Sequence, residues 1–291
     1  MLTLRKALSL NMLSLFLAGV LQGPALAATA APSTSEAGKA HQEGAQALIK
    51  ERQHLAQEAV EAQEAMLTAI YQLANHDKDG AYKSLTTASG KLDVLLARDP
   101  HLSMLPVDVR ASTTDLKADP KAVKETLSQV RAKLAAGKIQ EARTMLEPLT
   151  SEIRISTDYM PMETYPKAIK EATRDTQAGN TDAAAQILAD TLSSLVTKVN
   201  VIPLPPLKAE SDVQDAETMF QADPVKNKQA ALDLLKHASQ QLELGSLLGY
   251  GDFKTVKQEM DSVKHKVQGG SAENGLFGRL KSLLKDARSK I

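Results

Sequence analysis

Apolar residues recur at intervals of three and four through most of this chain, and this spacing limits the folds it can adopt. From Glu36 to Tyr71 they form one continuous stripe, and Val123, Leu127, Val130 and Leu134 form another. Such intervals place side chains on one face of an α-helix. The first helix is expected to stop at residues 75–80. Later helices are predicted at residues 81–97, from Asp119-Pro120 onward, and at 139–149, 166–178, 181–199, 208–221, 226–245, 252–267 and 275–290.

Two glycine turns indicate how these helices are arranged. Gly137 and Gly179 lie 42 residues apart, and each separates two predicted helices. An extended segment that contains proline follows each pair. The pattern predicts an all-α fold, a bundle of stacked antiparallel helical hairpins with a 42-residue internal repeat and a C-terminal helical extension. The only candidate strand is residues 153–155, and residues 101–117 are expected to be irregular.

Composition excludes several classes of function. The 291 residues contain 35 Lys and Arg against 35 Asp and Glu, and no Cys. A balanced charge argues against nucleic-acid binding, which requires a basic surplus. Without cysteine there are no disulfides, thiol nucleophiles or thiolate metal sites.

The N-terminus has the three parts of an export signal. Arg5 and Lys6 precede an apolar run over residues 7–21, and Ala25-Leu26-Ala27 offers small residues for cleavage. The run is shorter than the roughly 20 residues that span a bilayer. We expect a signal peptide over residues 1–27, cleaved after Ala27, a flexible leader over 28–39, and a periplasmic location.

The sequence contains no complete catalytic or metal-binding motif. The six histidines never fall four residues apart, as a helical metal site would need. Residues 75–80 imitate the start of a calcium loop, but its twelfth position is Thr86 instead of Glu. Ser282-x-x-Lys285 lacks its partner motifs. We therefore predict no enzymatic activity, no catalytic residue, no metal and no cofactor.

Two segments are candidate binding surfaces. The first comprises the two extended segments, where proline is expected to keep the chain out of a sheet. These segments are expected to line an apolar groove between hairpins. Its residues are Tyr159, Met160, Pro161, Met162, Tyr165, Ile202, Pro203 and Leu204. The alternative is ordinary core between the two repeats.

The second candidate is a basic amphipathic helix at the C-terminus, behind a glycine-containing hinge at residues 268–274. The residues that would contact a membrane or a partner are Leu276, Phe277, Arg279, Leu280, Leu283, Leu284 and Lys285. Such a helix can bind anionic lipid, dock on a partner, or pack on its own bundle.

The middle of the chain resembles the YfdX family of exported bacterial proteins. The resemblance rests on the glycine turns at Gly137 and Gly179 and on the step Tyr159-Met160-Pro161-Met162 between them. It implies an α-helical, periplasmic, oligomeric, stress-related protein with no established enzymatic activity. We assign residues 40–222 to a YfdX-like domain, 223–268 to a helical extension, and 269–291 to the hinge and basic helix.

These observations favour a non-enzymatic periplasmic stress protein that binds apolar surfaces, either of unfolded proteins or of small hydrophobic ligands. The expected partners include further copies of the chain. The alternative is a structural protein that binds a membrane surface or a partner through its C-terminal helix. A hydrolase would need carboxylates or histidines gathered in one cleft.

Overall fold

The computed structural model describes residues 42–50, 56–271 and 275–291, which all belong to one structural unit. The expected signal peptide and leader lie outside the described residues. A helical segment over residues 42–50 precedes the labelled elements. The labelled helices are α2 (Gln57–Ala74), α3 (Lys78–Arg98), α4 (Pro120–Ala135), α5 (Ile139–Leu146), α6 (Tyr165–Ala178), α7 (Thr181–Ser193), α8 (Leu204–Ala222), α9 (Lys228–Leu247), α10 (Lys254–Gln268) and α11 (Gly278–Arg288).

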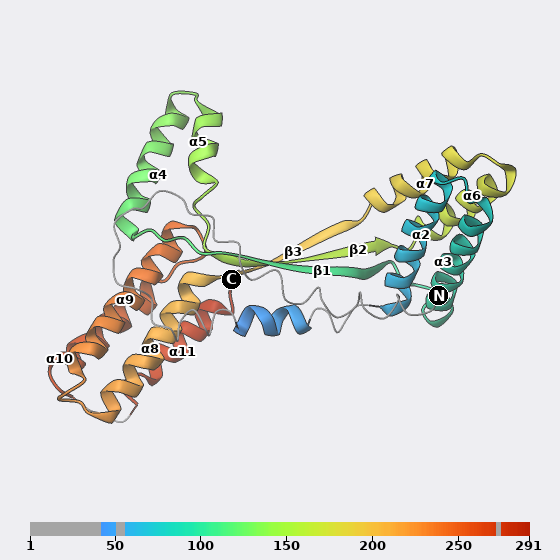
Figure 1. The fold of residues 1–291 in the computed structure, drawn as a ribbon. Coiled ribbons are helices and arrows are strands. Elements are labelled where there is room, and N and C mark those ends of the chain that lie inside the picture. The colour runs from blue at the N-terminus through green and yellow to red at the C-terminus, as the bar shows by residue number, and fades with distance from the viewer. Residues whose placement is uncertain (1–41, 51–55, 272–274) are drawn as a thin grey trace. The chain divides into compact units, whose positions relative to one another are not determined.

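Helices α2, α3, α6 and α7 form a first bundle (Figure 1). Alanines fill much of its interior, and this lets the helices approach closely. Larger side chains, among them Met66, Leu85, Ile169 and Leu188, are fully buried between them. The three-four spacing of the sequence therefore corresponds to this core.

Three strands form an antiparallel sheet in the order β1-β2-β3: β1 (Met104–Thr114), β2 (Glu152–Pro161) and β3 (Val196–Pro203). β2 is central and pairs with both neighbours, and the β1–β2 register shifts between Pro106 and Asp108. The expectation that residues 101–117 are irregular is therefore wrong.

The expectation that the proline segments stay out of a sheet is also wrong. Pro161 and Pro203 are the last residues of β2 and β3. A proline at the end of a strand removes few ladder hydrogen bonds, so it ends the strand without preventing the pairing before it.

Helices α8, α9, α10 and α11 form a second bundle, with a core of its own. β3 runs directly into α8, whose first residue is Leu204. α8 and α9 pack against each other along their length. The second bundle therefore begins inside the segment assigned to the YfdX-like domain, and the boundary proposed between residues 222 and 223 separates two helices that pack together.

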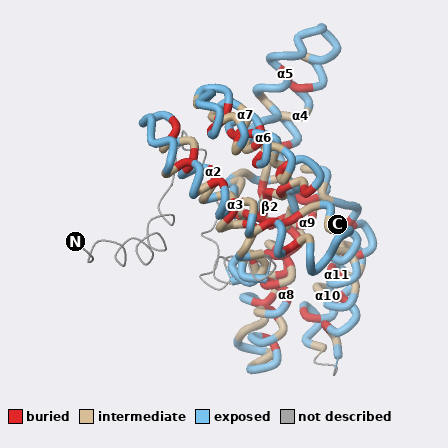
Figure 2. Tube along the Cα trace, turned by 90° about the vertical axis from the view of Figure 1, so that its right-hand side faces the viewer, coloured by how far each residue is buried: buried red, intermediate tan, exposed pale blue. Residues whose placement is uncertain are grey.

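Helices α4 and α5 form a hairpin that contacts the rest of the protein chiefly through α9. The side chain of Asp119 caps α4 by accepting a hydrogen bond of 2.8 Å from the backbone N–H of Ala122. Gly137 has a positive φ in the turn between the helices. Figure 2 shows this hairpin as mostly exposed, with few buried residues.

A short apolar cluster covers one end of the sheet. It joins Val109, Ile153 and Ile155 to Leu204 and Leu207 at the start of α8. Ala47 and Leu48 of the helical segment 42–50 pack against it.

The prediction of a mainly helical, bundle-like fold is confirmed. The sheet was not part of that prediction, and the sequence indicated a strand only at residues 153–155. The 42-residue repeat is not confirmed and stays a prediction.

Candidate functional site

The two proline segments lie at opposite ends of β2. Tyr159 pairs with Val196 at one end, and Ile153 pairs with Ile202 at the other. Met160, Met162 and Tyr165 are buried in the core of the first bundle, and burial raises the pKa of the Tyr165 hydroxyl to about 12. The predicted residues Tyr159–Tyr165 and Ile202–Leu204 therefore do not line one groove.

The C-terminal segment lies against its own bundle. Phe277, Leu280 and Leu284 are buried in the second core, and Leu276 and Leu283 are half-buried beside it. α11 contacts α8 and α10. Arg279 forms an ion pair of 3.2 Å with Glu259, and Lys281 one of 2.6 Å with Glu217. The apolar face proposed for a membrane or a partner is thus occupied within the chain.

Ile202 and Pro203 do line a cavity of about 590 Å³ beside the start of α8. Val201, Pro206 and Ile291 add apolar surface, and Glu43, Glu210, Lys285, Arg288 and Ser289 add polar groups. Arg288 bridges Glu43 and Glu210. Burial alone would lower the pKa of Arg288, but its hydrogen bond to Glu210 and the two carboxylate charges raise it, so the bridge stays charged.

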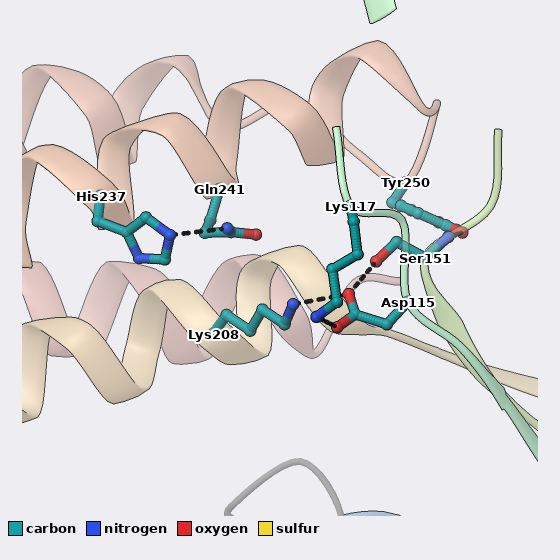
Figure 3. Close-up of polar contacts among 7 residues, drawn as sticks. All are labelled: Asp115, Lys117, Ser151, Lys208, His237, Gln241 and Tyr250. Atoms are coloured by element: carbon teal, nitrogen blue, oxygen red, sulfur yellow. Dashed lines mark hydrogen bonds and ion pairs between the residues drawn. The ribbon is translucent and has the colours of Figure 1, made fainter. Parts of the chain in front are cut away.

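A polar cluster connects the sheet to the second bundle (Figure 3). Lys208 of α8 lies 2.7 Å from Asp115, which follows β1, and Asp115 also contacts Lys117. The hydroxyl of Ser151 donates to the same carboxylate over 3.4 Å. Burial would raise the pKa of Asp115, but Lys208 and Lys117 outweigh it and lower the pKa. The carboxylate is therefore kept ionised as an ion-pair centre.

One turn further along α8, Asp212 is buried, and its carboxylate lies 2.7 Å from Nδ1 of His237 on α9. Gln241 lies 3.2 Å from Nε2 of the same ring (Figure 3). A His–Asp pair is two parts of a nucleophilic triad. The neighbouring hydroxyl, Ser211, is buried on the same helix as Asp212. The arrangement supports helix packing better than acyl transfer.

Within residues 42–50, 56–271 and 275–291, no group of three or more His, Asp or Glu side chains is placed to hold a metal ion. Over the same ranges, no helix is long and apolar enough to cross a membrane.

The sequence did not single out an exposed apolar surface on the α4–α5 hairpin. Val123 and Val130 of α4 and Ala142 of α5 are buried between the two helices. Three larger side chains at the margin of the same face remain in solvent: Leu134 is 49%, Ile139 64% and Leu146 42% exposed. We call these three residues the hairpin stripe. The helical spacing had placed Leu134 on an apolar face and predicted that it would be buried. Two helices alone cannot cover that face, so Leu134 remains exposed.

These features define a mainly helical protein in which an antiparallel sheet accompanies two helical bundles and an exposed hairpin. The family model described as YfdX protein matches residues 62–201, within the stretch that resembles this family in sequence. The match confirms that resemblance for residues 62–201, the segment of the chain that is similar to the YfdX family.

Among solved structures, a Salmonella Typhi YfdX is similar, with 12% sequence identity and a TM-score of 0.37. The similarity covers 52% of this chain and 93% of that one. No curated protein matches this chain.

Proposed function

We propose that this protein is a non-enzymatic, stress-related periplasmic protein that binds apolar surface on other proteins in a chaperone-like manner. Residues 1–27 would direct export and would then be removed. The hairpin stripe is the observation that carries the proposal, because it gathers three large apolar side chains on one projecting hairpin. Contiguous exposed apolar surface is typical of interaction sites.

The C-terminal helix supports the alternative less well. To bind lipid or a partner through its apolar face, α11 would have to leave the second bundle and expose Phe277, Leu280 and Leu284. Burying a large apolar side chain is worth about 1.5–3 kcal/mol, so release of three would cost several kcal/mol. The hairpin stripe is exposed without any rearrangement.

An aggregation assay tests the chaperone-like function. The mature chain is added to a heat-denatured model client, and light scattering is followed with time. We expect an equimolar amount to slow aggregation and the variant Leu134→Ser/Ile139→Ser to lose this effect. Val225→Ser is the matched control, because Val225 is 88% exposed but lies outside the hairpin. Equal suppression by both variants, or none by the native chain, would contradict the proposal.

A second candidate is the binding of a small hydrophobic ligand in the cavity at Ile202 and Pro203. Its volume of about 590 Å³ is within the range of small-molecule sites, and its lining combines proline and aliphatic surface with Lys285. Glu43 and Glu210 are paired with Arg288, whereas Lys285 is a cation outside that bridge, so the proposed ligand is an apolar molecule with an anionic group placed at Lys285.

An anionic naphthalene dye tests that cavity by fluorescence titration. Because the hairpin stripe also offers apolar surface, the titration compares Lys285→Glu with Leu134→Ser/Ile139→Ser. Binding in the cavity predicts that only Lys285→Glu weakens the dye affinity. Loss confined to the hairpin variant would assign the dye to the stripe.

A further inference from the structure

The charges around the hairpin stripe point to the kind of segment that it binds. We propose that the stripe receives an acidic amphipathic helix, which lies across the exposed side chains of α4 and α5. This inference rests on the proposed function and narrows it to one class of polypeptide.

The hairpin carries a basic surplus. Residues 120–147 contain six Lys and Arg against three Glu. Lys133 and Lys138 share one carboxylate, that of Glu141, at 2.5 and 3.1 Å. Their hydrogen bonds lower the pKa of Glu141, so it stays ionised but can neutralise only one of them. The end of the hairpin that carries Leu134 and Ile139 is therefore positively charged.

Arg131 adds to this charge. Its side chain is exposed one turn before the Gly137 loop, and it forms no ion pair with any residue in the described ranges. A partner with basic residues beside its apolar face would be repelled here, and one with acidic residues would be attracted. The same argument disfavours pairing between two copies of this hairpin, since each carries the same surplus.

The geometry of the stripe favours a helix. Val130 and Leu134 are four residues apart on α4, and Ile139, Ala142 and Leu146 follow the three-four spacing on α5. Both rows thus line the face where the two helices meet. From Ile139 to Leu146 the row rises by about 10 Å, or two helical turns. A third helix with apolar residues at the same spacing completes a three-helix unit and covers the stripe.

Synthetic helical peptides of about five turns test this inference by fluorescence anisotropy with the mature full chain. One peptide has a leucine and alanine face flanked by glutamates, the second has the same face flanked by lysines, and the third is the acidic peptide with two central prolines. We expect the acidic helix to bind about tenfold or more tightly than either of the others at low salt. The preference over the basic peptide should shrink in about 0.5 M salt, which screens the charges.

Two variants assign the binding to the hairpin. Leu134→Ser/Ile139→Ser should abolish binding of the acidic helix, and Arg131→Glu/Lys138→Glu should reverse the preference between the acidic and basic peptides. Val225→Ser should change neither. Circular dichroism of each variant establishes that the helices are retained.

Equal affinity for the acidic and basic peptides would overturn the charge selection, and equal affinity for the proline peptide would overturn the helical mode. Binding of none of the peptides would overturn the inference as a whole. These outcomes are separate from the proposed function, because suppression of client aggregation is measured independently.

Discussion

The hydroxyl of Tyr250 donates a hydrogen bond of 2.6 Å to the carboxylate of Glu152, 98 positions earlier in the chain. The same hydroxyl accepts a bond of 3.0 Å from the backbone N–H of Ser151. Glu152 begins β2, whereas Tyr250 follows α9. The second carboxylate oxygen of Glu152 pairs with Arg154 at 2.9 Å. One phenol therefore ties the central strand of the sheet to the second bundle.

Replacing Tyr250 by Phe removes this connection while it keeps the ring. The buried carboxylate of Glu152 retains Arg154 but loses its phenol donor, and the N–H of Ser151 loses its acceptor. A hydrogen bond to a charged group contributes about 1.5–3 kcal/mol, so we expect the free energy of unfolding to fall by about that amount. Urea denaturation measures it. Tyr71→Phe is the control, because Tyr71 is 71% exposed. A change of similar size in both variants would contradict the role of the contact.

The same residue makes stability sensitive to alkali. Burial, the hydrogen bond to Glu152 and its charge raise the pKa of Tyr250 from 10 to about 12. Between these values the unfolded chain releases the proton and the folded chain keeps it. Its contribution is therefore complete below pH 10 and is lost as the pH rises through 12.

Urea denaturation at pH 9, 10, 11 and 12 measures this dependence. Lysines also titrate in this range, so the comparison is made with Tyr250→Phe. We expect the native chain to lose more stability than the variant over the interval. Parallel curves would show that the Tyr250 proton is not linked to folding.

Asp115 makes the stability of the protein depend on pH in the acidic range. Burial would raise the pKa of this carboxyl group, but the charges of Lys208 and Lys117 and their hydrogen bonds lower it below the ordinary value of 3.8. The stabilisation is present above pH 3.8 and is lost as the pH falls through the lowered pKa.

Asp115→Asn should therefore destabilise the protein at neutral pH and leave Lys208 buried without its anion. We expect a loss of about 1–3 kcal/mol, because Asp115 is only partly buried. The difference from the native chain should shrink as the pH falls below about 4. Asp261→Asn, at an exposed ion pair, serves as the control. A difference that is constant from pH 3 to 7 would contradict the proposed ionisation.

Local signals in the sequence predicted most of the helices. The expectation of one continuous helix from Glu36 is wrong, because Ala56 is extended and α2 begins at Gln57. α4 begins at Pro120, after the Asp119 cap, as its motif indicated. α6 ends at Ala178, with Gly179 as its cap, and α7 begins at Thr181, as predicted. α7 stops at Ser193, however, where the prediction continued to residue 199. Caps, prolines and glycines act within a few residues, so they can be recognised without knowledge of the tertiary fold.

The strands and the candidate sites depend on distant contacts. In β1, Leu105, Val107 and Val109 alternate with more exposed residues and point inward. The second half of the strand is exposed and polar, so the alternation covers too few residues to predict a strand. β3 is mostly exposed along its length, so it has no alternation of buried and exposed residues that would mark it as a strand. Partners such as Asp115 and Lys208, 93 positions apart, have no local signature. The hairpin stripe was missed for a related reason: periodicity shows an apolar face but does not show what covers it.

Alanine substitutions at two glycines, one at a helix end and one within a helix, should change the stability of the protein in opposite directions. Gly179 ends α6 with a φ of +89°, and no atom lies within 4 Å of the position that a Cβ would occupy there. Gly179→Ala should therefore cost only the backbone strain of the left-handed conformation, about 1–2 kcal/mol.

Gly90 lies within α3 and is equally unobstructed. Gly90→Ala should stabilise the protein by about 0.5–1 kcal/mol, because alanine reduces the entropy of the unfolded chain. Thermal and urea denaturation should therefore give shifts of opposite sign. Stabilisation by Gly179→Ala would show that α6 does not end in this turn, and destabilisation by Gly90→Ala would show that α3 is interrupted at that position.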